Sequence, residues 1–559
     1  MNHSAWKLTV FALAAVLIVG GCDLKRRSDS GGGSSDSGSD GHGKAAENFV
    51  IDDTGTARLL PPDDLQQRQG KEVTDTTQGG SNAQGTRPGL SWIYDNKNNG
   101  FFLVAAASKP GTTGGDMIRR VDLGSNIKEF DYDKEIAGAQ GSYIYVPDEM
   151  RNAVPAKYID ADGLYSGIIC GFVPGPNKTV IALSGGSEGG VAFVINPYEE
   201  ASAFTPLQAI KFPYASNPCR AVYSDALKKL YVIDVARVES QAGQTGVFVA
   251  DIYNDNRGVL ASYYAFDLKN RINSHSIPNF QSIDIYNDAL FLLSGNGRFD
   301  AEWDSVVYYV PLNQAGEPIF ANYKYTRTNN PIIRTDGCAI SSWNLGSLAV
   351  TEQKGKPVLL TTGTTSIIAW EIGSDGELKK IDMNASRPGV QGLSTVNNGQ
   401  GGLKMAYSPD GKTIYSLPHC RSNENKIKLA LDGRPEFVFS ATAIDAETLE
   451  MKDAVDIAYR EFLKNLKGVS YLPQFTMTAR DFAVGKNHMV VLGSSASNIS
   501  GLNAGADISI IDLKKKTNIT FSKAEGRSAH EKNYGFKLAQ GDPKFNNVEQ
   551  NSHAAIWVP

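Results

Sequence analysis

The chain has 559 residues, of which 41% are hydrophobic and 21% are charged, a composition that indicates a globular protein rather than a disordered or fibrous one. Its formal net charge is −5, and the part of the chain expected to fold has no run of Lys or Arg, which excludes the basic surface of a nucleic-acid-binding protein. The 56 glycines, 23 tyrosines and 23 phenylalanines favour short β-strands joined by tight turns.

The first 21 residues have the pattern of a cleavable export signal. Lys7 and the amino terminus supply positive charge, and residues 8–19 form an apolar run. A membrane-spanning helix needs about 20 apolar residues, whereas the core of a signal peptide needs roughly 7 to 15. We therefore expect residues 1–21 to be a signal peptide that is removed on export.

The residues at the end of this run predict a lipid anchor. Val19, Gly20, Gly21 and Cys22 resemble the bacterial lipobox, in which a cysteine after two small residues receives the lipid. The resemblance implies a lipoprotein of the cell envelope, acylated with fatty acid such as palmitate at Cys22 and facing the periplasm. Asp23 favours the inner membrane by the sorting rule of enterobacteria, and the choice between inner and outer membrane stays open. The alternatives are an ordinary cleavage site with an incidental cysteine and an uncleaved anchor.

A flexible linker is expected between the anchor and the folded region. Residues 28–44 are almost entirely Ser, Gly and Asp, so they have no apolar side chain that could enter a core. Residues 22–46 should behave as a coil with a mean reach of about 25 to 30 Å. The folded region, residues 47–559, would then stand clear of the membrane surface.

A strand–turn–strand unit recurs along the folded region. In its clearest copy, Pro409, Asp410 and Gly411 supply turn chemistry between two β-rich runs. Tyr223 to Tyr231 repeats this pattern, and five looser copies bring the total to seven: residues 92–104, 172–183, 285–293, 348–360 and 482–492. Each copy is followed by another apolar strand, at residues 117–123, 191–196, 247–252, 306–312, 367–372, 442–445 and 508–513.

These repeats resemble the bacterial β-propellers of the YVTN and lactonase-like kind, whose blades carry a Ser-Pro-Asp-Gly-Lys turn before an apolar aromatic strand. Residues 407–415 match that pattern closely, residues 223–231 match it partly, and the other copies match in hydrophobic pattern alone. The resemblance implies an all-β propeller of seven blades. Residues 142–146 contain a further apolar run that keeps eight blades as an alternative. Either residues 48–52 or residues 553–558 could supply the strand that closes the ring.

One segment departs from the β pattern. Val455, Ala458, Tyr459, Phe462 and Leu466 recur at helical spacing, with charged residues between them. We expect one inserted amphipathic helix that begins at Asp453 and ends at Leu466, and that packs on the propeller or serves as a docking element.

Four cysteines remain after Cys22. Cys170 and Cys219 precede the turns of successive repeats by similar intervals, so neighbouring inner strands could bring them together in a disulfide. Cys338 and Cys420 are either a second bridge or two buried thiols.

The motifs that reveal most enzymes are missing, so catalysis stays uncertain and the sequence leans against it. No nucleophile elbow, zinc-binding His-Glu-x-x-His helix, phosphate-binding loop or haem motif occurs, and no cofactor is predicted. The candidate metal or acid–base residues are His419 with Cys420, and His488, although structural roles are the better interpretation.

Two short loops have weaker functional interpretations. Asp160 and Asp162 hint at a cation loop, but the later bidentate acid of an EF-hand is missing, so a solvated turn is the better interpretation. Residues 185–190, Gly-Gly-Ser-Glu-Gly-Gly, fit a tight loop better than an anion-binding nest.

We therefore expect a lipid-anchored binding or assembly module of the cell envelope. We expect the lipid to attach the protein to the membrane, and the loops and the inserted helix to contact an envelope protein. No nucleic-acid partner is expected. The alternative is a lactonase-like hydrolase with a divalent metal in the central channel, which would require at least three Asp, Glu, Asn or His side chains to converge at one channel mouth.

Overall fold

The computed structural model describes the strand-forming part of the chain. It covers residues 49–51, 57–59, 100–107, 116–121, 143–186, 189–199, 203–213, 215, 218–234, 245–252, 257–266, 279–295, 305–328, 346–362, 367–381, 400–422, 439–458, 476–478, 481–499, 502–518 and 552–559. The expected signal peptide, Cys22 and the linker lie outside these residues. Among the described residues, no helix is long and apolar enough to cross a membrane.

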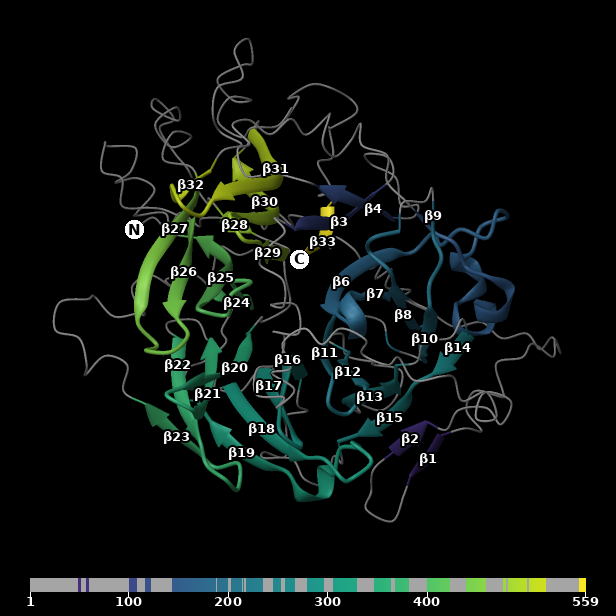
Figure 1. The fold of residues 1–559 in the computed structure, drawn as a ribbon, viewed down its shortest axis with the longest axis horizontal. Helices are drawn as coiled ribbons and strands as arrows, with labels where there is room; N and C mark the ends of the chain where they lie inside the picture. The colour runs from purple at the N-terminus through teal and green to yellow at the C-terminus, as the bar shows by residue number, and fades with distance from the viewer. Residues whose placement is uncertain are drawn as a thin grey trace, which may run out of the picture.

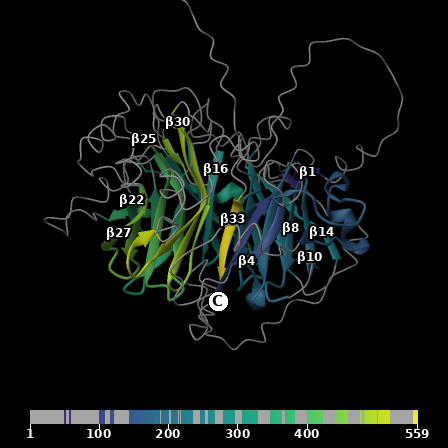
Figure 2. The same cartoon turned by 90° about the horizontal axis from the view of Figure 1, so that it is seen from above.

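Seven blades of mainly antiparallel strands stand around a central axis, which confirms the predicted seven-bladed β-propeller (Figure 1). The view from above shows the strands inclined side by side around the ring (Figure 2). We number the blades along the chain. Blade 1 consists of β33 (Ser552–Val558), β3 (Phe101–Ala107) and β4 (Asp116–Val121). Blade 2 consists of β6 (Ile168–Pro174), β7 (Val180–Gly185), β8 (Gly190–Ile195) and β10 (Gln208–Phe212), with β14 (Arg257–Leu260) added in parallel to β10.

Blades 3 to 5 each have four strands in chain order from the axis outward. Blade 3 is β11 (Arg220–Ser224), β12 (Lys229–Ile233), β13 (Gly246–Asp251) and β15 (Ser262–Ala265). Blade 4 is β16 (Asn279–Tyr286), β17 (Ala289–Gly295), β18 (Ser305–Pro311) and β19 (Lys324–Arg327). Blade 5 is β20 (Leu348–Gln353), β21 (Lys356–Thr362), β22 (Ile367–Ile372) and β23 (Leu378–Ile381).

Blades 6 and 7 are joined by a short strand. Blade 6 is β24 (Gln400–Tyr407), β25 (Thr413–Ser422), β26 (Phe439–Asp445) and β27 (Met451–Ala458). Blade 7 is β29 (Asp481–Val484), β30 (His488–Ile499), β31 (Leu502–Asp512) and β32 (Thr517–Asn518). The strand β28 (Thr476–Thr478) pairs with both β25 and β30 and so connects the two sheets.

The C-terminal strand closes the ring. β33 pairs antiparallel with β3, so the two ends of the propeller sequence form one blade. Of the two candidate closing segments, the structure thus uses the C-terminal one. The other candidate contains β1 (Phe49–Ile51), which pairs with β2 (Ala57–Leu59) in a separate hairpin. Among the described residues, the run proposed as an eighth blade supplies only β5 (Tyr143–Ile144), which pairs in parallel with β9 (Ala203–Phe204).

The turn chemistry recognised in the sequence forms the inner hairpin of blade 6. Asp410 accepts a hydrogen bond from the backbone N–H of Lys412 at 3.0 Å, and the Ser408 hydroxyl donates to Asp410 at 2.6 Å. Gly411 has a φ of +67°, a conformation that a side chain disfavours. The tight turn places Tyr407 opposite Ile414 at the start of the strand pair.

Apolar side chains between neighbouring blades form the cores. The interface of blades 3 and 4 is centred on Phe266, which is 1% exposed. Its ring lies 5.4 Å from that of Tyr308 and 5.0 Å from that of Tyr323, centroid to centroid. Each blade therefore buries both faces against its neighbours, which explains the run of apolar residues in strands such as β7 and β8.

The predicted helix is wrong in its first part. Residues 453–458 belong to β27, which pairs antiparallel with β26, and residues 459–466 lie outside the described residues. Val455 and Ile457 also fit the two-residue period of a strand, so a short apolar run is compatible with either structure. Residues 453–458 form a strand and not a helix because their backbone groups form hydrogen bonds with the free edge of β26.

A disulfide joins the inner strand of blade 2 to the entry into blade 3. It links Cys170 and Cys219, whose Cα atoms are 5.3 Å apart. β6 approaches this segment closely, because a Cβ on Gly171 would lie 2.8 Å from the carbonyl oxygen of Cys219.

Ring closure should depend on Trp557. Its indole is 7% exposed and packs beside Gly485, where a Cβ would lie 2.6 Å from the ring, so it joins blade 1 to the inner turn of blade 7. We expect Trp557→Ala to lower the free energy of unfolding by about 3–5 kcal/mol, measured by chemical denaturation, because it leaves a large cavity. Tyr325→Ala, at an aromatic residue that is 47% exposed, is the control and should cost about 1 kcal/mol or less. Equal losses in the two variants would contradict this role.

Candidate functional site

The innermost strands of all seven blades surround one cavity on the axis. β6, β11, β16, β20, β24, β29 and β33 each contribute lining residues, and the cavity has a volume of about 250 Å³. This is near the lower end of the roughly 300–1,000 Å³ typical of small-molecule sites. The central channel is therefore the candidate functional site.

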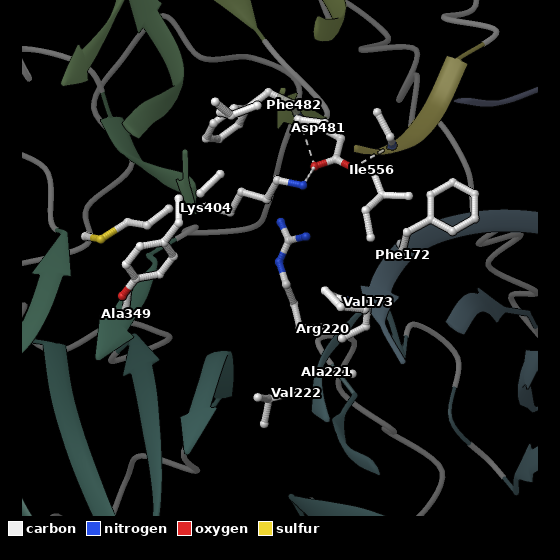
Figure 3. Close-up of a pocket in the computed structure, with 18 of the residues that line it drawn as sticks. Phe172, Val173, Arg220, Ala221, Val222, Ala349, Lys404, Asp481, Phe482 and Ile556 are labelled. Atoms are coloured by element: carbon white, nitrogen blue, oxygen red, sulfur yellow. Dashed lines mark hydrogen bonds and ion pairs between the residues drawn. The ribbon is translucent and has the colours of Figure 1, made fainter. Parts of the chain in front are cut away.

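Three charged side chains from three blades meet in this channel (Figure 3). Arg220 extends from β11, Lys404 from β24 and Asp481 from β29, and their charged ends point toward one another. Lys404 Nζ lies 2.5 Å from Asp481 Oδ1, in an ion pair of which 25% of the Lys404 side chain and 5% of the Asp481 side chain remain exposed. The Lys404 ammonium also lies 5.4 Å from the centre of the Phe482 ring.

The Asp481 carboxylate is held in place by the backbone of two strands. Oδ1 accepts a hydrogen bond from the Phe482 N–H at 2.9 Å, in addition to the ion pair with Lys404. Oδ2 accepts a hydrogen bond from the N–H of Ala555 on the closing strand, also at 2.9 Å. Asp481 thus joins blade 7 to blade 1 and fixes the position of Lys404 at the same time.

Burial disfavours the positive charge of both channel bases. Desolvation lowers the pKa of Arg220 from its ordinary value, and the nearby Asp481 carboxylate works in the opposite direction. Desolvation also lowers the pKa of Lys404, which the charge of Asp481 and its hydrogen bond oppose and the charge of Arg220 reinforces. Burial thus opposes the charged form of both bases, and the Asp481 carboxylate favours it.

A second acid of the channel wall has a bridging role. Asp284 on β16 accepts a hydrogen bond from the N–H of Val350 on β20 at 2.8 Å, and from its neighbour Ile285 at 2.9 Å. Ser282 and Gln281 make similar bridges to the segment that begins β20. Burial raises the pKa of Asp284 to about 7, against the effect of the two backbone hydrogen bonds.

The histidine and cysteine candidates do not gather in this channel. His488 is the first residue of β30, is 6% exposed, and pairs in register with Asp512. Burial lowers its pKa, while the charge of Asp512 raises it. His419 and Cys420 lie on β25, where Cys420 is opposite Thr478, and their side chains lie outside the described residues.

The two loop candidates form turns. Asp160 Oδ1 accepts hydrogen bonds from the N–H of Asp162 at 3.0 Å and of Leu164 at 2.8 Å, so it closes an exposed turn. The Gly-rich segment connects β7 to β8, and Gly189 has a φ of +105°. Within the described part of the chain, no group of three or more His, Cys, Asp or Glu side chains is placed to hold a metal ion.

Sequence reasoning overlooked the three charged channel residues, although the repeats contain a signal for them. Arg220, Lys404 and Asp481 each stand three residues before the last apolar or aromatic residue of an inner strand, in the runs Arg-Ala-Val-Tyr, Lys-Met-Ala-Tyr and Asp-Phe-Ala-Val. The inner strands of the blades are equivalent, so charged side chains at the same position of three repeats lie at the same height along the channel axis. Comparing the units position by position would have identified them.

No protein-family model matches the sequence, and no curated protein matches it significantly. Among solved structures, a putative 6-phosphogluconolactonase from Bacteroides fragilis is 12% identical, with 83% of this chain and 99% of that chain covered and a TM-score of 0.39. A putative 6-phosphogluconolactonase from Bacteroides uniformis is 13% identical, covering 63% of this chain and 79% of that one, with a TM-score of 0.33. The periplasmic gluconolactonase of Pseudomonas aeruginosa is 13% identical, with coverages of 64% and 95% and a TM-score of 0.29. These similarities concern the propeller fold alone.

Stability should depend on pH through Asp284. Its pKa is about 7 in the folded protein against an ordinary 3.8, so between these values the folded state keeps a proton that the unfolded state has lost. The contribution of Asp284 to the free energy of unfolding therefore falls as pH rises from about 4 to about 7. Asp284→Asn removes this dependence and leaves one backbone N–H without its acceptor, at a cost of about 1–3 kcal/mol.

Chemical denaturation at about pH 5 and about pH 8 measures this effect. The stability lost in Asp284→Asn should be greater at the lower pH. Asp162→Asn, in an exposed turn, is the control and should keep the wild-type difference between the two conditions. A loss of equal size at both values would show that Asp284 does not titrate in this range.

Proposed function

We propose that the protein is a lipid-anchored binding propeller of the bacterial cell envelope that holds a small charged ligand in its central channel. The observation that supports this function is the convergence of Arg220, Lys404 and Asp481 from three separate blades on one cavity. Small-molecule sites are commonly concave, mostly apolar, and equipped with a few converging polar groups. The channel has this character.

The lining chemistry favours binding over the hydrolytic alternative. The described channel lining contains no histidine, and its cysteine, Cys219, is in a disulfide. A divalent metal would need several oxygen or nitrogen ligands, whereas the side chains that converge here are two bases and one acid that is already bound by Lys404 and two backbone N–H groups. No observation in the described residues specifically favours a metal-dependent hydrolase.

The lipid anchor and the linker would attach the propeller by its rim. The hairpin β1–β2, which follows the linker, contacts β15 of blade 3 at the outer edge of the disc (Figure 1). An attachment at that edge leaves the axis of the channel free for a ligand. The lipid on Cys22, the envelope location and an envelope protein that contacts the rim loops are parts of this proposal, and Asp23 favours the inner membrane.

The anchor is tested by Cys22→Ala. Wild-type protein expressed in bacteria should incorporate an alkyne analogue of palmitate and sediment with membranes, whereas the variant should lose both the label and the sedimentation. Cys338→Ala is the matched control and should keep both. Label that persists in Cys22→Ala would refute lipidation at that residue.

The channel is tested with full-length protein in a non-ionic detergent. We expect small anions from a mixed panel to raise the midpoint of thermal unfolding, and small cations and neutral molecules to leave it unchanged. Lys404→Met should weaken the binding of those anions by about ten-fold, because it removes a charge-assisted contact. Lys379→Met, at an exposed position of β23, is the control. Anion binding that is unaffected by Lys404→Met would place the site elsewhere.

A further inference from the structure

We infer that the ligand of the central channel has an apolar aromatic body, one ring or two fused rings in size, and not the hydroxyl-rich body of a sugar. This inference rests on the proposed function, namely that the channel is a ligand site. It adds the chemical class of the part of the ligand that the channel encloses.

The charged and amphipathic side chains of the channel lining are already engaged within the protein. Lys404 pairs with Asp481, whose oxygens also accept hydrogen bonds from the N–H groups of two strands. The charge of Asp481 acts on Arg220 as well. Asp284 directs its two oxygens to backbone N–H groups, and the Ser282 hydroxyl oxygen accepts a hydrogen bond from a backbone N–H of β20.

The other hydroxyl groups of the lining are also in use. The Tyr407 phenol donates a hydrogen bond to a carbonyl oxygen of β20, and the Tyr223 phenol donates one to Asp225 at 3.3 Å. The Ser408 hydroxyl both donates and accepts hydrogen bonds within its own turn. A sugar that enters the channel would therefore lose the hydrogen bonds of its hydroxyl groups to water and find few new partners, which weakens its binding.

Aromatic residues from five blades line the cavity. They are Phe172 of blade 2, Tyr223 of blade 3, Tyr407 of blade 6, Phe482 of blade 7 and Trp557 of blade 1. Phe172 and Tyr407 are half-buried, so part of each residue remains accessible to a ligand. Aromatic rings pack edge-to-face or offset-stacked with other rings, and such pairs are more favourable than their contact area alone implies. An aromatic ring therefore fits this lining better than a saturated one.

The aliphatic part of the wall and the volume of the cavity set the size of this body. Val173, Ala221, Val222 and Ile556 line the same cavity (Figure 3), and their side chains offer dispersion contacts and no hydrogen bonds. The cavity has a volume of about 250 Å³. An apolar cavity of roughly 150 Å³ is large enough to bind benzene, so the channel can accept one ring or two fused rings.

Calorimetric titration of the full-length protein in a non-ionic detergent tests the ligand class. The probes are benzoate, 2-naphthoate, cyclohexanecarboxylate and gluconate, which carry the same single negative charge and differ in their bodies. Benzoate should bind about two- to ten-fold more tightly than cyclohexanecarboxylate, because only benzoate gains aromatic contacts. 2-Naphthoate should bind about three- to ten-fold more tightly than benzoate, since it buries more apolar surface. Gluconate should bind at least about ten-fold more weakly than benzoate, because its hydroxyl groups find few partners.

Two variants of Phe172 test the aromatic part of the wall. Phe172→Leu should weaken benzoate binding by about three-fold or more and change cyclohexanecarboxylate binding by less than about two-fold, because it removes a ring and keeps an apolar side chain. Phe172→Tyr keeps the ring and should keep the affinity for benzoate. Phe204→Leu, at a buried aromatic residue of β9 outside the cavity, is the matched control and should bind both probes as wild type. Thermal unfolding without ligand verifies that each variant is folded, and the four probes on the wild-type protein decide the ligand class if Phe172→Leu does not fold.

The outcomes separate the two proposals. Gluconate binding that is at least as tight as benzoate binding and is weakened by Lys404→Met would overturn the apolar class while leaving the channel as a ligand site. Cyclohexanecarboxylate binding that is at least as tight as benzoate binding would overturn the aromatic class in the same way. Benzoate binding that is equal in wild type and in folded Phe172→Leu would overturn the role of Phe172. Binding of none of these probes, together with no response to the wider anion panel, would overturn both the inference and the proposed channel function.

Discussion

The contact between Asp481 and the closing strand is the constraint on which the molecule depends. The carboxylate of Asp481 binds the N–H of Ala555 with one oxygen and the Lys404 ammonium with the other. The first bond connects blade 7 to blade 1 at the point where the two ends of the propeller sequence meet. The second places a lysine from blade 6 in the channel. One side chain therefore links the closure of the ring to the chemistry of its centre.

The same kind of bridge recurs elsewhere around the axis. The described inner strands of neighbouring blades do not pair with one another, so side chains must satisfy backbone N–H groups that no β-ladder reaches. Asp284 does this for Val350, and Ser282 for Leu348, between blades 4 and 5. Asp284 and Asp481 therefore each use their carboxylate to hold the inner strand of the next blade in place.

Much of the fold could be predicted because each blade is a local unit. The Ser-Pro-Asp-Gly turn before Lys412 forms a hairpin because its own side chains and Gly411 satisfy the turn, and the apolar runs on each side form the strands β24 and β25. The site was harder to predict. His488 and the Asp160 turn attracted attention because of their residue types, yet one is buried beside Asp512 and the other closes a surface turn. Arg220, Lys404 and Asp481 are separated by long stretches of sequence, and only the ring brings them together.

The sequence by itself determined the all-β class, the number of blades and the position of most of the inner turns, because these follow from hydrophobic period and turn chemistry over a few residues. The first predicted copy, residues 92–104, is the exception, because β3 pairs with β33 and β4 and so takes its inner neighbour from the C-terminus. Tertiary structure alone decided three other features. Pairing with β26 made residues 453–458 a strand, since backbone N–H groups beside an open edge gain more from that ladder than from an isolated helical turn. Pairing with β3 selected β33 as the closing strand over the segment near residue 50. The convergence of two bases and one acid on the axis depends on how the blades are arranged around it, and within the sequence only a comparison of the repeats with one another points to it.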